Sequence, residues 1–259
     1  MNIDNPIILA LDYSELDEAR AILSKVRPNI GMIKIGLELF TAYGREALDL
    51  SKEFSVPVFL DLKLNDVPTT VAKTTEVVCS HLSRYPGEHF LSIHCNGGAE
   101  MCQAAYKVAN GSNVTITGIT VLTSLTESDF SEIGFRDCRP GIRTVDLAYL
   151  GADCLNEKIV WDTSSGTRQR VLSGLRSLVC APTQLNLMRQ HLGDDIILIT
   201  PGIRADADDT HDHARSKPAS FAIKNGANWI VIGRPITKAQ DPVLASATFK
   251  TQVERARHG

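Results

Sequence analysis

Asp61, Lys63 and Asp66 place three charges within or next to the apolar run at residues 56–64. The alternation of a β-strand would turn Asp61 and Lys63 toward the same face of a sheet. A buried charge is costly, and even a buried ion pair often fails to recover its desolvation cost, so a fold seldom keeps such a cluster for stability alone. We therefore expect these residues to take part in chemistry.

Further side chains capable of chemistry stand where other apolar runs end, namely Asp12, Lys34, His94, Ser124, Arg204 and Arg234. Each alone has an ordinary structural explanation, such as a helix cap for Asp12 or a core histidine for His94. In a barrel of parallel strands, however, the carboxyl ends meet at one mouth, where catalytic residues gather. We expect these residues to converge there.

Short apolar runs alternate with helix-like segments along the 259 residues. The runs expected as strands are residues 7–12, 32–36, 58–63, 90–94, 113–121, 177–180, 196–200 and 229–232. Continuous hydrophobicity is typical of parallel strands covered by helices, and eight such strands in about 250 residues match a (β/α)8 barrel. A doubly wound open sheet is the alternative, but no GxGxxG motif follows the first run. We predict one α/β domain, a TIM barrel spanning residues 1–259.

The alternation lapses at residues 126–176, between the fifth and sixth expected strands. Turn-forming sequences at 138–143, 156–158 and 162–166 interrupt any single helix there. Apolar patches at 145–150 and 159–161 argue against disorder. We expect an enlarged region of loop and helix.

Two glycine-bearing turns follow the last two expected strands. One carries Pro201 and Arg204, and the other carries Gly233 and Arg234. A barrel commonly binds phosphate after its seventh and eighth strands, where glycines expose backbone N–H groups and an arginine can bind two phosphate oxygens at once. These turns predict a phosphorylated ligand.

The composition narrows the class of partner. The formal net charge is −3 and no block of lysines or arginines occurs, which argues against nucleic acid or an anionic membrane. The six cysteines form no CxxC pair and no zinc-like spacing, so we expect reduced thiols. Residues 1–6 lack the features of a secretory signal, and no apolar stretch approaches a membrane span of about 20 residues. We expect a cytoplasmic protein that acts on a small molecule.

The stretch around His211 and His213 contains several potential metal ligands. It lacks the glycine and closing glutamate of a calcium loop, and it has no HExxH spacing. A solvated loop is the better interpretation, so no metal site is predicted.

One set of motifs runs through both ends of the chain. Its members are Asp12, Lys34, DxKxxDVPTT at 61–70, HCNGG at 94–98, TVLTS at 120–124, TPGIR at 200–204 and GRPIT at 233–237. In order and approximate spacing, over residues 7–125 and 178–242, the set resembles the orotidine 5'-phosphate decarboxylase family. The resemblance implies a dimeric barrel that converts orotidine monophosphate (OMP) to uridine monophosphate (UMP) and carbon dioxide. It also implies no cofactor or metal.

The resemblance assigns the catalytic roles residue by residue. Lys63 would donate a proton to C6 of the pyrimidine, and Asp61 would lie against the departing carboxylate. Asp66 and Thr70 would reach this centre from the neighbouring subunit of a homodimer. Lys34 would continue the array of charges.

The same resemblance assigns residues that bind the nucleotide. Asp12, with Lys34, would hold the ribose hydroxyls, Ser124 would contact the pyrimidine, and Gly233 with Arg234 would hold the phosphate. His213 aligns near a glutamine that covers the phosphate and the base in the family. Within the DxKxxD motif's extension, Val67 and Thr69 stand where the family usually has isoleucine and asparagine.

Two alternatives share part of this pattern. Magnesium-dependent sugar-phosphate decarboxylases and aldolases also carry DxKxxD, but the Val67, Pro68 and Thr70 that follow argue against them. A catalytically silent nucleotide-binding regulator is the second alternative. The presence of both Asp61 and Lys63 disfavours it.

Overall fold

The computed structural model describes residues 3–132, 140–152, 158–162, 167–171, 174–204 and 217–258. Within these residues, eight parallel strands close into a barrel in the order β1-β12-β9-β8-β5-β4-β3-β2. The strands are β1 (Ile7–Ala10), β2 (Met32–Gly36), β3 (Val58–Leu64), β4 (His89–His94), β5 (Val114–Ile119), β8 (Ser177–Val179), β9 (Ile197–Thr200) and β12 (Trp229–Ile232). Each falls on an expected run, so the predicted (β/α)8 barrel is confirmed.

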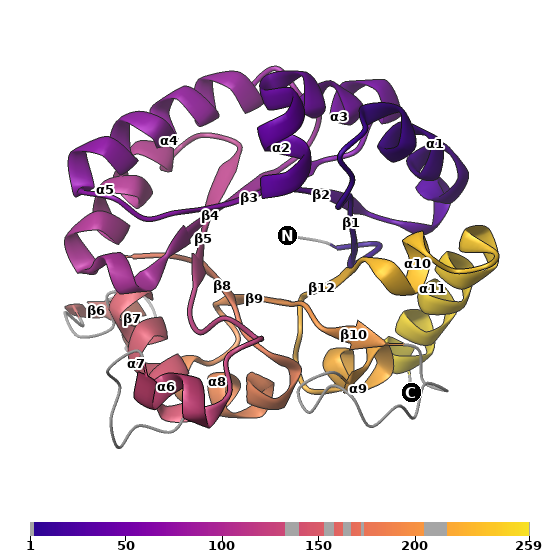
Figure 1. The fold of residues 1–259 in the computed structure, drawn as a ribbon. Coiled ribbons are helices and arrows are strands. Elements are labelled where there is room, and N and C mark those ends of the chain that lie inside the picture. The colour runs from indigo at the N-terminus through magenta and orange to yellow at the C-terminus, as the bar shows by residue number, and fades with distance from the viewer. Residues whose placement is uncertain are drawn as a thin grey trace.

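Helices surround the ring of strands (Figure 1). They are α1 (Leu16–Val26), α2 (Leu37–Tyr43), α3 (Asp49–Phe54), α4 (Pro68–Leu82), α5 (Ala99–Ala109), α8 (Leu185–Leu192), α9 (Ala219–Lys224), α10 (Arg234–Thr237) and α11 (Pro242–His258). In α1, the buried residues Ala19, Leu23 and Val26 recur at helical spacing and face the core, whereas Asp17 and Glu18 lie in its first turn. This pattern packs the helix against the strands.

The strand residues bury their side chains on both faces, which is why their sequences are continuously apolar. Ile7, Leu9 and Ile33 belong to the core between strands and helices. Phe59, Phe90 and Trp229 belong to a second cluster. Phe90 meets Phe59 and Trp229 edge to face, with ring centroids 6.1 and 6.2 Å apart. These large rings pack the second cluster.

The enlarged region does lie between β5 and β8, which are neighbours in the barrel. The expectation of loop and helix alone was wrong. The region contains the helices α6 (Glu127–Glu132) and α7 (Pro140–Ala152), and also an antiparallel pair, β6 (Lys158–Asp162) with β7 (Thr167–Val171). Asp162, the first of the turn-forming residues 162–166 that we took only as helix breakers, is the last residue of β6.

No helix in the described part of the chain combines the length and the apolarity of a membrane span.

Candidate active site

A cavity of about 230 Å³ opens where the barrel strands end. Its apolar wall includes Pro201, which follows β9, and the side chains of Ile119, Val121, Val179 and Val231. The charged side chains that reach the cavity are Lys34, Asp61 and Lys63. A mostly apolar pocket with a few convergent charged groups is the usual form of a small-molecule site.

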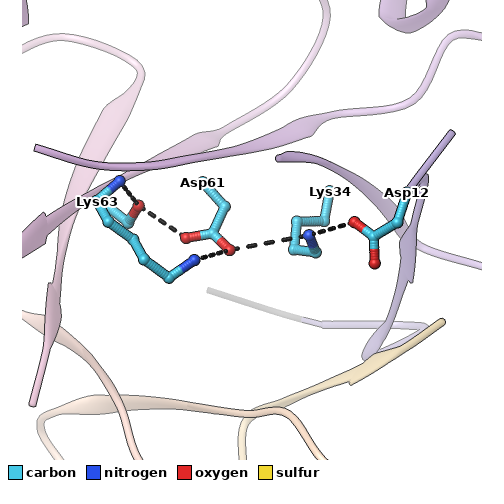
Figure 2. A network of polar contacts seen from close by, with 5 residues as sticks. Asp12, Lys34, Asp61 and Lys63 are labelled. Atoms are coloured by element: carbon cyan, nitrogen blue, oxygen red, sulfur yellow. Dashed lines mark hydrogen bonds and ion pairs between the residues drawn. The ribbon is translucent and has the colours of Figure 1, made fainter. Parts of the chain in front are cut away.

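Three of these residues, with Asp12 beside them, form a chain of four charges of alternating sign (Figure 2). Lys34 Nζ lies 2.9 Å from Asp12 Oδ1 and 3.8 Å from Asp61 Oδ2. Lys63 Nζ lies 2.8 Å from the same Oδ2 atom of Asp61. One carboxylate oxygen therefore stands between two ammonium groups, and the structure brings together four of the predicted site residues.

The exposure of these side chains is graded. The Asp61 and Lys34 side chains are 10% and 13% exposed, whereas those of Lys63 and Asp12 are 30% and 57% exposed. The inner pair thus lies in an environment of lower polarity than the outer residues. Electrostatic interactions are stronger there than in water.

The register of the strands sets this arrangement. Lys34 of β2 pairs with Ala10 of β1 and with Phe59 of β3, while Gly36 pairs with Asp61. A Cβ atom at Gly36 would lie 2.8 Å from Lys34 Nζ and 3.5 Å from Asp12 Oδ1. The missing side chain of Gly36 leaves room for the Lys34 ammonium beside Asp12.

The end of β3 departs from a regular strand. Its pairing with β4 shifts between Leu60 and Leu64, and Lys63 has a left-handed backbone with φ of 52°. The Lys63 N–H donates to Oγ of Ser92 at 2.8 Å, and this Oγ donates to Asp61 Oδ1 at 2.8 Å. Sequence reasoning missed Ser92, because a serine inside the apolar run of β4 carries no signal of its own.

His94, at the end of β4, also lies near the charges. Burial and, to a smaller extent, the positive charge of Lys63 lower its pKa, while Asp61 acts in the opposite direction. A neutral imidazole beside Lys63 leaves the ammonium groups of Lys34 and Lys63 as the positive charges of the cavity.

Asp66 and Thr70 do not join the chain of charges within one subunit. Asp66 is exposed, and its Oδ1 accepts the N–H of Val67 at 2.6 Å. Thr70 is exposed in the first turn of α4. Among the described residues of this single chain, Asp66 makes no ion pair with Lys63.

The two glycine-bearing turns lie at the same mouth. A Cβ atom at Gly233 would lie 3.4 Å from Ala10 Cβ and 3.8 Å from Asp12 Oδ2, so this turn adjoins Asp12. Arg234 is exposed in the first position of α10. Arg204 instead donates to the carbonyl of Ile203 at 3.0 Å, within the short strand β10 (Ile203–Arg204).

The described residues show no contact that tests the predicted roles of Ser124 and His213. Ser124 is exposed and follows Thr123, which lines the cavity. His213 lies outside the described residues, and so does His211. Their predicted contacts remain predictions.

The Asp61 carboxylate, which belongs to the DxKxxD motif of the magnesium-dependent alternative, already has partners. Both oxygens of Asp61 accept hydrogen bonds, Oδ1 from Ser92 and Oδ2 from Lys63. In the part of the chain that the structure describes, no three His, Cys, Asp or Glu side chains gather as metal ligands would. A cation at Asp61 would have to displace Lys63.

Comparisons with known proteins agree on one family. Its model, described as "Orotidine 5'-phosphate decarboxylase / HUMPS family", matches residues 5–249. A protein of Wolbachia pipientis subsp. Culex pipiens named orotidine 5'-phosphate decarboxylase is 36% identical over 243 residues, or 93% of this chain and 96% of that protein. One of the same name from Nitrosomonas eutropha is 34% identical over 253 residues, or 98% and 99% of the two chains.

A solved structure gives the same answer. The crystal structure of orotidine 5'-phosphate decarboxylase from Lactobacillus acidophilus superposes with a TM-score of 0.74 at 27% identity, and the match covers 96% of this chain and 99% of that one. The fold, the alternating charges at the barrel mouth and the full-length matches lead to one conclusion. The chain belongs to the orotidine 5'-phosphate decarboxylase / HUMPS family.

Proposed function

We propose that this protein decarboxylates OMP to UMP and carbon dioxide, the last step of pyrimidine nucleotide synthesis. The observation that carries the proposal is the Lys63 ammonium, held 2.8 Å from Asp61 beside the cavity. Relatives that share most of its length are named orotidine 5'-phosphate decarboxylase, which supports the choice of substrate.

The reaction needs a fixed positive charge. When the bond from C6 to the carboxylate breaks, carbon dioxide leaves and the electron pair remains on C6 in an sp² orbital that the ring cannot delocalise. An ammonium aimed at C6 stabilises this developing carbanion and can then transfer its proton to it. We assign both steps to Lys63, so that no cofactor takes part.

Repulsion between Asp61 and the substrate carboxylate is too weak to drive the reaction alone. Two unit charges 4 Å apart interact by about 4 kcal/mol at an effective dielectric constant of 20. The largest enzymatic accelerations correspond to about 20 kcal/mol or more. The preorganised ammonium groups of Lys34 and Lys63 must therefore contribute most, by stabilising the transition state.

The rest of the nucleotide binds around this centre in the proposal. Asp12 and Lys34 would contact the ribose, Ser124 the base, and the turn of Gly233 and Arg234 the phosphate. The apolar wall of the cavity suits a pyrimidine ring. Binding energy from the phosphate, remote from C6, can hold the site closed and thereby raise kcat/KM.

We also propose that the active unit is a homodimer that shares its sites. Asp66 and Thr70 are exposed on their own chain, and the neighbouring Val67 is an apolar side chain that is 58% exposed. An interface at this surface would bury Val67 and bring Asp66 to the partner's Lys63. Such a shared site is available in a two-fold dimer, because each subunit gives and receives the same residues.

Mixed dimers test this sharing. Lys63→Ala and Asp66→Ala proteins are each expected to be nearly inactive. Random pairing of the two should restore about a quarter of the parental activity, since half of the dimers would carry one intact site out of two. If the mixture stays as inactive as its components, Asp66 does not act across an interface.

Two broader expectations complete the proposal. We propose that residues 1–259 work as one barrel domain, which the pairing of β1 with β12 supports because it joins the two ends of the chain. We also propose a cytoplasmic location. The buried, unpaired thiols of Cys79, Cys95, Cys102 and Cys180 support it, since disulfides are rare in that compartment.

The activity is tested by incubating the protein with OMP and following the loss of its ultraviolet absorbance, with UMP identified as product. A chelator should leave the rate unchanged, whereas it should abolish the activity of a magnesium-dependent sugar-phosphate enzyme of the same barrel group. No UMP from OMP, together with chelator-sensitive activity on a sugar phosphate, would favour that alternative.

A further inference from the structure

Ser92 connects the two most important residues of the site. It lies within β4, and its side chain is fully buried. Its hydroxyl donates to Oδ1 of Asp61 at 2.8 Å and accepts the backbone N–H of Lys63 at 2.8 Å. A serine hydroxyl has one hydrogen to donate. Ser92 uses it on the Asp61 carboxylate.

The backbone at Lys63 explains why such a partner is needed. Among the described residues, only Ser55 and Lys63 combine a side chain with a positive φ, and the value at Lys63 is 52°. L-residues rarely adopt this region because Cβ approaches the backbone too closely. Strained backbone of this kind persists where the surroundings hold it in place, and such positions are common at active sites.

The pairing of β3 with β4 shows which residue keeps Lys63 in its left-handed conformation. Leu60 pairs with Leu91 and Leu64 pairs with Ile93. Asp61, Leu62 and Lys63 therefore lie opposite Ser92 alone, and the Lys63 N–H bonds to the serine side chain. Beside this irregularity, Lys63 Nζ lies 2.8 Å from Asp61 Oδ2.

We propose that Ser92 is a positioning residue for decarboxylation: its hydroxyl orients the Asp61 carboxylate and holds the left-handed turn that directs Lys63 toward C6. The effect of Ser92 on the rate rests on the proposed function. Its effect on the positions of Asp61 and Lys63 does not, and can be tested separately. Ser92 itself makes no contact with substrate in this proposal.

Removal of the hydroxyl has two consequences at once. In Ser92→Ala, Asp61 Oδ1 loses its donor and the Lys63 N–H loses its acceptor, in a place that water does not reach. The carboxylate can then rotate, and the turn can relax toward an ordinary strand. Ser92→Thr keeps the hydroxyl and should restore both bonds.

Ser177 provides a matched control. It is a fully buried serine of β8 that accepts a hydrogen bond from Thr117 at 3.0 Å, and it does not line the cavity. Ser177→Ala removes a buried hydroxyl from the same barrel without touching Asp61 or Lys63. A loss of Tm or kcat that both alanine variants share reflects the loss of a buried hydroxyl. An additional loss of kcat in Ser92→Ala reflects the positions of Asp61 and Lys63.

The kinetic experiment compares kcat, KM and Tm of the parent with those of Ser92→Ala, Ser92→Thr and Ser177→Ala, with OMP as substrate. We expect kcat of Ser92→Ala to fall about 100-fold, the loss typical of a reacting group misplaced by roughly 1 Å. KM should change much less, Ser92→Thr should recover most of kcat, and Ser177→Ala should keep it. If Ser92→Ala retains near-parental kcat while losing as much Tm as Ser177→Ala, the proposal is wrong.

A crystal structure of Ser92→Ala separates this inference from the proposed function. The expected result is a rotated Asp61 carboxylate and a Lys63 φ that has left the positive region. Unchanged geometry at both residues would refute the positioning role, whatever the activity. A parent protein that forms no UMP from OMP would instead refute the proposed function.

Discussion

Lys63 Nζ lies 2.8 Å from Asp61 Oδ2, and both residues belong to the end of β3. Residues two apart on a regular strand share a face. The left-handed backbone at Lys63 is a departure from regular strand geometry. Lys34 Nζ approaches the same oxygen at 3.8 Å. The Asp61 carboxylate therefore holds two ammonium groups in place.

Loss of the charge at Asp61 should lower kcat while the shape of the side chain is nearly kept. In Asp61→Asn, an amide of nearly the same shape no longer balances Lys34 and Lys63, which then repel each other. We expect kcat to fall about 10²- to 10³-fold, the size of effect seen when one preorganised electrostatic group is removed. Asp195→Asn, at an exposed position, is the control. Equal kcat in the two variants would show that Asp61 is dispensable.

Gly36→Ala should disturb the Lys34 ammonium. Gly36 has φ of −98° and ψ of −170°, which alanine adopts without strain, but its Cβ would lie 2.8 Å from Lys34 Nζ. The flexible end of Lys34 can move aside, so the protein should fold with Lys34 displaced from Asp12. We expect kcat/KM for OMP to fall about 10²-fold.

Gly141→Ala in α7 serves as the control for this substitution, because the added Cβ would meet only Leu187 at an ordinary contact distance of 3.5 Å. It should leave kcat/KM unchanged. If Gly36→Ala behaves like Gly141→Ala, the space beside Lys34 has no catalytic importance.

The phosphate assignment predicts a dependence on the substrate's own phosphate. Arg234→Ala should lose kcat/KM with OMP by roughly 10²-fold or more, since remote binding energy contributes to the rate. With orotidine, which lacks the phosphate, parent and variant should be equally slow. Arg84→Ala, another exposed arginine, should match the parent on both substrates. A similar loss on OMP and orotidine would contradict a contact between Arg234 and phosphate.

His89, at the start of β4, should make folding stability depend on pH. Its Nδ1 accepts the N–H of Val58 at 3.0 Å, its other nitrogen lies 3.4 Å from the carbonyl of Tyr85, and burial lowers its pKa. The unfolded state takes up a proton below its ordinary pKa of about 6.5, whereas the folded state resists it. Stability from His89 is therefore present above that pH and lost as the pH falls toward the lowered folded pKa.

Urea unfolding of the parent and His89→Gln at pH 7.5, 6.5 and 5.5 measures this effect. The difference in free energy of unfolding between the two proteins should narrow as the pH falls. The lowered pKa values of His81 and His94 are common to both proteins and cancel in this difference. A difference that stays constant across this range would show that His89 titrates alike in both states.

The barrel was predictable because its strands have two buried faces and therefore read as continuous apolar runs. The helices were less predictable, because α2 (Leu37–Tyr43) follows β2 without an intervening turn and residues 44–54 are divided into a 3-10 turn and α3. The strands β6 and β7 pair only with each other. The apolar patch of β6 is only three residues long, at 159–161, and β7 is mostly polar, so neither sequence distinguished a strand from a loop.

The candidate site was predictable where charge interrupts an apolar run, as at Asp61 and Lys63. It was not predictable where an uncharged residue acts through geometry. Ser92 resembles a core residue in the sequence, and only the shifted register of β3 and β4 shows that its hydroxyl serves the site. The space left by Gly36 is likewise visible only once Lys34 and Asp12 lie beside it.

The central claim is that the Lys63 ammonium stabilises the carbanion and supplies the proton to C6. The most direct test is the rate of UMP formation from saturating OMP by Lys63→Ala, with Lys73→Ala, an exposed lysine of α4, as control. Because electrostatic stabilisation and proton donation are lost together, we expect a decrease on the order of 10⁴-fold or more for Lys63→Ala, and none for Lys73→Ala. UMP formation by Lys63→Ala at a rate near that of the parent would contradict the account.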